Sequence, residues 1–270
     1  CYEWRNRMEK AVLFFDIDGT VLSEKTKEVP QSAVEALQKA HEAGHQLFIN
    51  TGRTICSIPE PIKKLPFDGY LCGCGTYLIY EGEVVFSSSI GQKRGAEIVK
   101  KIEECNMAAF AEGQEDIYYP EKVTRFVGLE RSRQNFHEKG MGLSAYLESS
   151  EIVYDKFFLY KDENSDMEAF EKYVEDELEA IDRGNNTYEV IQKGYTKGTA
   201  CEYIRKRLEA TMDQIYVFGD SSNDLAMFQY AQHTVAMGYH DPVLEPYTEF
   251  ITKEVEKDGI AHAMKHYGLI

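Results

Sequence analysis

Short apolar runs alternate with segments of helical periodicity at both ends of this sequence, and this alternation restricts the fold more than any other feature. Residues 11–15 form an apolar run of strand length, Pro30 opens a helical segment that we expect to end at Gly44, and residues 46–50 form the next strand. A continuous apolar run is typical of a strand buried on both faces of a parallel sheet. The alternation returns later, with strands predicted at 188–191, 215–218, 234–236 and 250–252. Alternating strands and helices with short connections predict an α/β fold with a doubly wound parallel sheet.

The middle of the chain lacks this regular alternation. We predict a helix at 96–104, strands at 108–111, 117–119 and 152–160, and a long acidic helix at 165–181. Mixed elements of this kind are typical of an α+β domain. The sequence therefore predicts a Rossmann-like core made of residues 8–86 and 187–270, with an α+β domain of residues 87–186 inserted into it. Residues 1–7 are interpreted as a leader or an upstream extension.

Composition and charge exclude several classes of protein. The 270 residues include 30 Lys and Arg against 46 Asp and Glu, a formal net charge of −16, whereas a nucleic-acid-binding face needs positive charge to neutralise phosphates. No apolar run approaches the ~20 residues of a membrane-spanning helix, and the first residues lack the apolar centre of a signal peptide. The six cysteines show no compact disulfide framework. We therefore expect a cytoplasmic protein with buried thiols that binds neither nucleic acid nor membrane.

Carboxylates follow two of the predicted strands. Asp16 and Asp18 come directly after the first strand, in FFDIDGT, and Asp220 and Asp224 follow a later strand, in GDSSND. The carboxyl ends of strands in a doubly wound sheet meet at the crevice where ligands bind. Carboxylates gathered there repel one another, so a divalent cation between them is expected. A polar turn explains DIDGT about equally well when it is taken alone, and Asp224 could instead complement the dipole of the helix that it starts.

Groups suited to binding an anion occur in two further motifs. In NTGR, Thr51 offers a hydroxyl, Gly52 lets backbone N–H groups approach an anion closely, and Arg53 offers a fork of donors. In GYTKGTA, Lys197 stands at the start of a predicted helix. A positive charge is unfavourable against the helix dipole at that end unless an anion is bound there. An ordinary strand-to-helix turn is the alternative interpretation of NTGR.

Together, FFDIDGT, NTGR, GYTKG and GDSSND in this order resemble the motifs of the haloacid dehalogenase-like (HAD) superfamily of phosphatases. The long insertion resembles in position and size the cap domain of the Cof-type hydrolases within that superfamily. The resemblance extends over nearly the whole chain from Met8 onward. One departure is local: Cof-type proteins usually carry Asn-Gly-Ala after the third strand, where this chain has Cys72-Gly73-Cys74-Gly75-Thr76. This change affects the expected substrate contacts.

The resemblance implies a two-step phosphoryl transfer. Asp16 would attack phosphorus and form an aspartyl-phosphate, and Asp18 would protonate the leaving alcohol and then deprotonate the attacking water. Mg²⁺ would be held by the carboxylates of Asp16 and Asp220 and by the backbone carbonyl of Asp18. Asp224 belongs to the same metal site and would more readily orient the groups around the ion.

The same resemblance implies a set of groups that bind the phosphoryl oxygens. Arg53 is the ambiguous member, since it could hold the substrate or brace its own loop. The others are the Ile17 backbone N–H, Thr51, the Gly52 N–H, Lys197 and Asn223.

We therefore expect a Mg²⁺-dependent phosphatase of small phosphorylated metabolites, such as sugar phosphates or related cofactor phosphates. Its partner would be a small-molecule phosphate ester, and the protein would be a monomer or a weak homodimer. A phosphomutase or a narrowly specific sugar-phosphate phosphatase on the same core is the alternative enzyme. A phosphate-sensing regulatory protein is the alternative without catalysis, although such receivers need neither the insertion nor the spacing of Asp16 and Asp18.

Two other groups of residues have competing interpretations. Lys122, Arg125, Arg131 and Arg133 could contact an anionic substrate, but a solvated loop is the simpler explanation. His262 and His266 have a spacing compatible with a metal site, yet the sequence offers no third ligand, which favours an exposed helix face.

Overall fold

The computed structural model describes residues 10–270, which form two compact units. Unit 1 contains the chain up to Arg53, Ile58–Phe86 and Tyr195–Ile270, and unit 2 contains Thr54–Ser57 and Ser87–Gly194. The second boundary between the units thus falls after Gly194 instead of after residue 186. The leader interpretation of residues 1–7 concerns residues outside those described. Within residues 10–270, no helix has the length and apolarity needed to cross a membrane.

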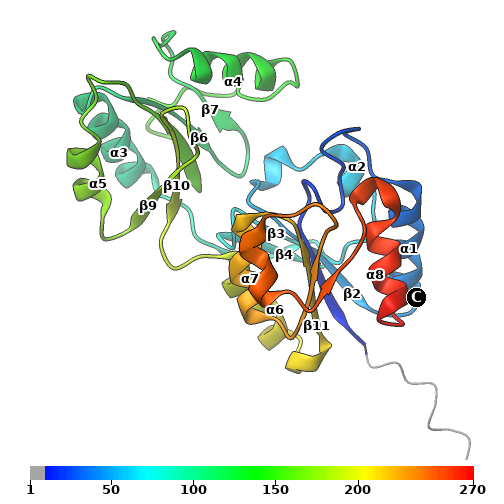
Figure 1. The fold of residues 1–270 in the computed structure, drawn as a ribbon. Coiled ribbons are helices and arrows are strands. Elements are labelled where there is room, and N and C mark those ends of the chain that lie inside the picture. Colours follow the sequence, from blue (N-terminus) through cyan, green and yellow to red (C-terminus); the bar gives the residue numbers. More distant parts are fainter. Residues whose placement is uncertain (1–9) are drawn as a thin grey trace, which may run out of the picture. The chain divides into compact units, whose positions relative to one another are not determined.

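An eight-stranded sheet forms the centre of unit 1, in the order β13-β12-β11-β1-β2-β3-β4-β5 (Figure 1). Neighbouring strands from β13 to β3 are parallel, and β4 pairs antiparallel to β3. The strands are β1 (Val12–Phe15), β2 (Gln46–Asn50), β3 (Gly69–Cys72), β4 (Tyr77–Tyr80), β5 (Glu83–Ser87), β11 (Ile215–Gly219), β12 (His233–Ala236) and β13 (Phe250–Ile251).

Helices cover both faces of this sheet, with α1 and α8 on one side and α6 and α7 on the other (Figure 1). The α-helices are α1 (Gln31–Glu42), α2 (Glu60–Lys63), α6 (Lys197–Arg207), α7 (Leu225–Tyr230) and α8 (Gly259–His266). Short 3-10 turns complete the unit: η2 (Met212–Gln214), η3 (Ser222–Asp224), η4 (Pro242–Tyr247) and η5 (Val255–Lys257). The predicted α/β fold with a doubly wound parallel sheet is confirmed.

The sequence pattern explains why β1 stands in the middle of the sheet. All four of its residues are buried, because β2 and β11 pair with it on either side and helices cover both faces. Phe14 stacks on Phe48 of β2, and Phe15 stacks on Phe218 of β11, with ring centroids 5.4 and 4.5 Å apart. The strand therefore presents its C-terminal residue, and Asp16 after it, at the centre of the sheet edge.

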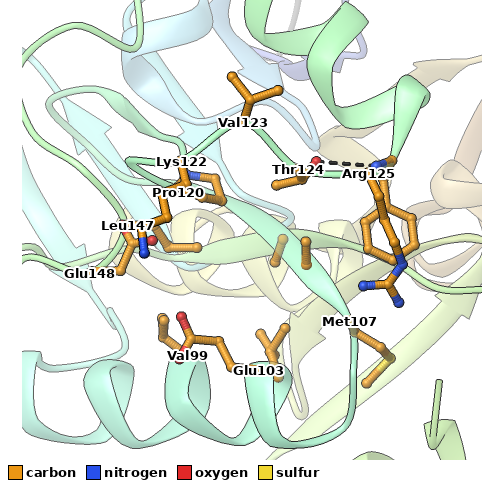
Figure 2. Close-up of a pocket in the computed structure, with 14 residues that line it drawn as sticks. Val99, Glu103, Met107, Pro120, Lys122, Val123, Thr124, Arg125, Leu147 and Glu148 are labelled. Atoms are coloured by element: carbon orange, nitrogen blue, oxygen red, sulfur yellow. Dashed lines mark hydrogen bonds between the residues drawn. The ribbon is translucent and has the colours of Figure 1, made fainter. Parts of the chain in front are cut away.

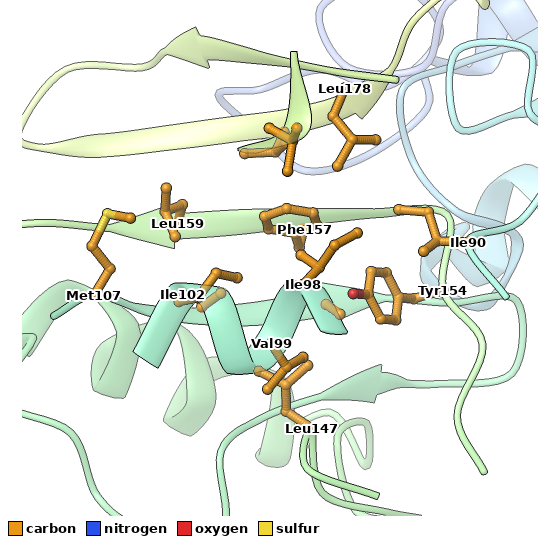
Figure 3. Packing of buried hydrophobic residues seen from close by; sticks show 14 of the residues in the cluster. Ile90, Ile98, Val99, Ile102, Met107, Leu147, Tyr154, Phe157, Leu159 and Leu178 are labelled. Carbon is orange, nitrogen blue, oxygen red and sulfur yellow. The ribbon is translucent and has the colours of Figure 1, made fainter. Parts of the chain in front are cut away.

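Unit 2 contains a five-stranded sheet in the order β7-β6-β8-β10-β9. All its pairings are antiparallel. Ile98 and Ile102 of α3 lie in one core cluster with Phe157 and Leu159 of β8 (Figure 3). Phe170 and Val174 of α5 belong to the same cluster. The elements are η1 (Ile55–Ser57), α3 (Gln92–Glu104), β6 (Ala108–Glu112), β7 (Ile117–Tyr118), α4 (Val127–His137), β8 (Lys156–Tyr160), α5 (Met167–Val174), β9 (Leu178–Asp182) and β10 (Thr187–Gln192).

Two sequence predictions in this region were wrong, and one helix was missed. The helix predicted at 165–181 ends at Val174, since Leu178–Asp182 form β9 and pair with β10. The strand predicted at 188–191 is β10, and it pairs with β8 and β9 of unit 2 rather than with the parallel sheet. No helix was expected at 127–137, where α4 buries only Leu129 fully and so carries a weak apolar signal.

Candidate active site

The four motifs meet at one edge of the parallel sheet of unit 1. Asp16 follows β1, Thr51 follows β2, Asp220 follows β11, and Lys197 begins α6. Backbone hydrogen bonds fix the strand ends: the N–H of Asp16 donates to the Phe218 carbonyl at 3.0 Å, and that of Thr51 to the Leu71 carbonyl at 2.8 Å. The sheet thus gathers groups from four parts of the sequence, as the strand order predicts.

Lys197 is the cation at the centre of this group. Its side chain is completely buried, and its Nζ donates to Asp16 Oδ1 at 2.7 Å, to Asn223 Oδ1 at 2.9 Å and to Asp224 Oδ1 at 2.5 Å. Burial lowers the pKa of Lys197, but the charges of Asp16 and Asp224 more than compensate, so the net shift is upward. The ammonium therefore stays charged and is held in place by three acceptors.

The helix start positions Lys197. Thr196 caps α6 by accepting a hydrogen bond from the Thr199 N–H, and the Thr199 hydroxyl accepts one from the Thr196 N–H. The Asn50 amide, at the end of β2, donates to the Lys197 carbonyl at 2.9 Å. Gly198 fits tightly, since a Cβ there would lie 2.5 Å from the Ala226 carbonyl oxygen. These contacts fix the backbone from which the Lys197 side chain enters the site.

Asp220 is held against the turn that follows β1. The Thr20 hydroxyl donates to its Oδ1 at 2.8 Å. Gly19 has a φ of +80°, and a Cβ at this position would lie 2.3 Å from Asp220 Oδ2, so only glycine allows the turn to approach the carboxylate this closely. Thr20 was not among the predicted site residues, although its place in DGT was a usable signal.

Three carboxylates lie close enough together to share a cation. Oxygens of Asp16, Asp220 and Asp224 lie within 4.8 Å of one another. Burial, and then the negative charge of Asp224, raise the pKa of Asp16 to about 7 despite the opposing effect of Lys197. Burial, followed by the charges of Asp16 and Asp224, raises the pKa of Asp220 to about 8. One ammonium does not neutralise three carboxylates, and oxygen donors are what Mg²⁺ prefers, so these residues fit a divalent cation.

Asp224 serves the architecture of the site as well as its charge. Its Oδ1 accepts from Lys197, and its Oδ2 accepts from the backbone N–H groups of Asp220 and Ser221 at 2.9 and 3.0 Å. Both oxygens of this fully buried carboxylate already have protein partners. This arrangement supports the expectation that Asp224 orients the groups around a metal more than it binds the metal directly.

Arg53 binds Asp18. Its Nε donates to Asp18 Oδ2 at 2.7 Å and its Nη2 to Asp18 Oδ1 at 2.8 Å, a two-pronged pair that is partly exposed. The sequence analysis left open whether Arg53 holds the substrate or braces its loop. In the structure, two of its donors face the carboxylate expected to act as acid and base.

The other groups expected to bind phosphate lie beside Lys197. A Cβ built on Gly52 would lie 3.6 Å from the Asn223 amide nitrogen and 3.4 Å from Cys74 Sγ. Thr51 is buried. The backbone N–H of Ile17 forms a hydrogen bond that lowers the pKa of Asp16, so this N–H lies near the Asp16 carboxylate. Cys74 has a φ of +54° and belongs to the segment that departs from the Cof-type pattern, so its thiol borders the predicted phosphate site.

Two of the four basic residues considered in unit 2 have acidic partners. Arg125 pairs with Asp162 at 2.6 Å, and Arg133 pairs with Glu130 at 3.0 Å and donates to the Pro120 carbonyl. Lys122 and Arg125 also line a pocket of about 330 Å³ beneath the segment from Pro120 to Phe126 (Figure 2). The ion pairs favour a structural role for the two arginines.

The two histidines of α8 pack on an aromatic ring. His266 lies parallel to Phe250 with the ring centroids 3.9 Å apart, and His262 stacks on the same ring at 5.6 Å. His262 Nδ1 also lies 3.1 Å from the Thr252 hydroxyl. The predicted exposed helix face is therefore only partly exposed, because both rings pack on Phe250 of β13.

A family model described as haloacid dehalogenase-like hydrolase matches residues 13–264. The chain belongs to this family. It is similar to the putative phosphatase YkrA of Bacillus subtilis, with 25% identity over 265 residues that cover 97% of this chain and 100% of the relative. It is also similar to the pyridoxal phosphate phosphatase YbhA of Escherichia coli, with 26% identity over 94% of this chain and 97% of the relative.

The solved structures agree with the family. The HAD subclass IIB sugar phosphatase BT4131 superimposes with a TM-score of 0.77 at 26% identity, over 97% of this chain and 100% of that one. The resemblance to Cof-type HAD hydrolases is thereby confirmed. This HAD-like hydrolase is a phosphatase, that is, a hydrolase of phosphoric monoesters.

Proposed function

We propose that this phosphatase is Mg²⁺-dependent and hydrolyses small phosphorylated metabolites, sugar phosphates or related cofactor phosphates, through an aspartyl-phosphate. The observation that carries the mechanism is the buried contact between Lys197 and Asp16 inside a group of three carboxylates. The substrate class is supported by two relatives, one named for pyridoxal phosphate and one for sugar phosphates.

In the first step, a carboxylate oxygen of Asp16 forms a bond to phosphorus while the bond from phosphorus to the ester oxygen breaks. Lys197 contributes a fixed positive charge beside the attacking carboxylate, which offsets the repulsion between two anions. Asn223 and the Gly52 N–H line the same side of the site and would donate to phosphoryl oxygens. Water then attacks the aspartyl-phosphate and releases inorganic phosphate.

Asp18 is proposed to deliver a proton to the leaving oxygen and to remove one from the attacking water. Arg53 occupies both carboxylate oxygens of Asp18 with two hydrogen bonds. Asp18 must leave this pair before either oxygen can reach the leaving group or the attacking water. We infer that Arg53 is a positioning residue, which holds the Asp18 side chain between turnovers.

The metal would be held by the carboxylates of Asp16 and Asp220, together with the main-chain carbonyl of Asp18. It would supply positive charge against the phosphoryl oxygens during transfer. Thr20 and Asp224 orient this donor set, because Thr20 donates to Asp220 and Asp224 accepts from the Asp220 N–H. Unit 2 is proposed to act as the cap that determines which leaving group is accepted.

A phosphate-release screen over sugar, nucleotide and cofactor monophosphates with Mg²⁺ tests the proposal, with Asp16→Asn as the control. We expect release from a subset of sugar or cofactor phosphates by the native protein and none above background by the variant, because an amide cannot form the acyl-phosphate. Release of phosphate by a purified, folded Asp16→Asn protein would contradict the mechanism. Release from nucleotides alone would contradict the substrate class.

A further inference from the structure

The chain enters unit 2 through three consecutive serines, Ser87, Ser88 and Ser89. Serine runs between domains are typical of flexible linkers, because they carry no apolar surface to bury. Here, however, each of the three hydroxyls has its own partner within unit 2. Gln114 donates to Ser87 Oγ at 3.0 Å, Ser88 Oγ donates to Gln192 Oε1 at 3.2 Å, and Ser89 Oγ donates to Asp155 Oδ1 at 2.5 Å.

The chain leaves unit 2 after Gly194, two residues beyond Gln192, and the Gln192 side chain joins the two connections. Its Nε2 donates to the Ser88 carbonyl at 2.8 Å and to the Asp155 carbonyl at 3.0 Å, and its Oε1 accepts from the Ser88 hydroxyl. One glutamine therefore uses both ends of its amide to hold the incoming connection against the outgoing one.

Asp155 anchors this arrangement to the body of unit 2. Its side chain is 1% exposed, it precedes β8, and it accepts from Ser89. The neighbouring Tyr154 carbonyl accepts from the Ile90 N–H at 2.8 Å, which continues the contact along the backbone. The entry segment is thus bonded both to a buried side chain and to the backbone beside it, which indicates a fixed junction.

We propose that Ser88, Ser89, Asp155 and Gln192 form a clasp that ties the incoming and outgoing connections of unit 2 into one joint. Without these hydrogen bonds, the two connections could move independently of each other. With them, Ser88, Ser89 and Gln192 are held together beside Asp155, so the two connections move as one. The clasp is a conformational device of the fold and does not depend on the identity of the substrate.

Hydrogen exchange of the full-length protein, followed by mass spectrometry, tests the clasp directly. We compare the native chain with Gln192→Ala, and use Gln92→Ala as the matched control, because Gln92 is an exposed glutamine of unit 2 with one hydrogen bond, to the Glu151 carbonyl. We expect slow exchange in the native peptide over residues 87–90. Gln192→Ala should speed exchange there at least about 10-fold, although the substitution lies more than 100 residues away in the sequence.

Two results would overturn the proposal. One is exchange over residues 87–90 that is already as fast in the native chain as in an unstructured peptide. The other is an effect of Gln192→Ala that stays within the peptide carrying the substitution, or that equals the effect of Gln92→Ala. Neither result depends on catalysis, so failure of the clasp and failure of the proposed function are distinguishable.

Kinetics provides a second measurement, which rests on the proposed function. With a substrate found by the release screen, Gln192→Ala should lower kcat about 3- to 10-fold and leave the dependence on Mg²⁺ concentration unchanged. Gln192→Glu keeps the acceptor for Ser88 but turns a carboxylate oxygen towards the two carbonyls that the amide contacts, so its kcat should fall at least as far as that of Gln192→Ala. A near-native kcat in either variant would contradict a role of the clasp in turnover.

Discussion

Lys197 is the residue on which the electrostatics of the site depend most. It is a buried cation with three acceptors, two of them carboxylates, and it contacts the proposed nucleophile directly. The sequence analysis identified it from its unfavourable place at a helix N-terminus. It could not predict the pair between Arg53 and Asp18, because these residues lie 35 positions apart and follow different strands. Sequence motifs predict which residues belong to the site, whereas the packing of the strand ends determines which of these residues contact one another.

Substitution Lys197→Ala should lower kcat/KM at least about 100-fold, because the attack of one anion on another loses its fixed positive charge. It should also lower the melting temperature by several degrees, since Asp16 and Asp224 then remain buried without a cation. Lys206→Ala is the control on the same helix, where the lysine pairs with Glu202 at the surface. Near-native kcat/KM in Lys197→Ala, with Lys206→Ala also unaffected, would remove Lys197 from the mechanism.

Substitution Asp155→Asn should stabilise the protein at alkaline pH. Burial raises the pKa of Asp155 from 3.8 to about 6, against the opposing effects of Ser89 and Gln114. The ionised carboxyl thus costs folding free energy above pH 6, and this cost disappears as the pH falls towards 4. The variant should gain roughly 1–3 kcal/mol at pH 8 and much less at pH 4.5.

Calorimetric melting at the two pH values measures this effect. Asp162→Asn is the opposite control, because hydrogen bonds from Arg125 hold the pKa of that exposed carboxyl at about 2. Its removal should not stabilise the protein at pH 8. An Asp155→Asn melting temperature that is unchanged or lower at pH 8 would show that the buried charge is not costly.

At the scale of elements, helix α6 links stability to catalysis. The capping box of Thr196 and Thr199 fixes its first turn, which carries Lys197.

The sequence pattern failed to predict where helix α5 ends. Acidic residues continue from α5 into β9, so charge alone suggested one long helix. The apolar residues change from helical spacing at Phe170 and Val174 to alternation at Leu178 and Ala180.

Thr196→Ala should lower the free energy of unfolding by about 1 kcal/mol, the usual cost of losing an N-cap. It should also reduce kcat several-fold, because the first turn of α6 carries Lys197. Thr211→Ala is the matched control, since Thr211 forms a capping box at η2 without a catalytic residue. Urea denaturation and steady-state kinetics measure the two effects. Equal losses of kcat in the two variants would contradict the positioning role of the α6 cap.

At the scale of the whole molecule, the parallel core was predictable and unit 2 was less so. Buried strands such as β1 and β11 carry continuous apolar runs that end in recognisable motifs. These runs and motifs made it possible to predict both strands and the site residues that follow them. β10 has two buried residues among half-buried ones, so its sequence did not reveal that it pairs with β8 rather than joining the parallel sheet. Partner choice among strands depends on tertiary packing.

Divalent cations should stabilise the whole protein, and more so at high pH. The pKa values of Asp16 and Asp220 are raised to about 7 and about 8, so without metal the ionised site loses stability as the pH rises through these values. The increase in melting temperature caused by Mg²⁺ should therefore be larger at pH 8.5 than at pH 5.5, and EDTA should abolish turnover. An equal increase at both pH values would contradict a metal bound by these carboxylates.

The position of β1 has a consequence for synthesis. This strand emerges from the ribosome early, yet its partner β11, and the Asp220 that binds Thr20 across 200 residues of sequence, are made only after all of unit 2. Unit 2 can complete its own sheet first, whereas the catalytic edge stays open until the last third of the chain arrives. Long-range pairing of this kind folds slowly. A nascent chain that stops before β11 would therefore carry a finished unit 2 and an exposed strand edge on β1, which chaperones must cover.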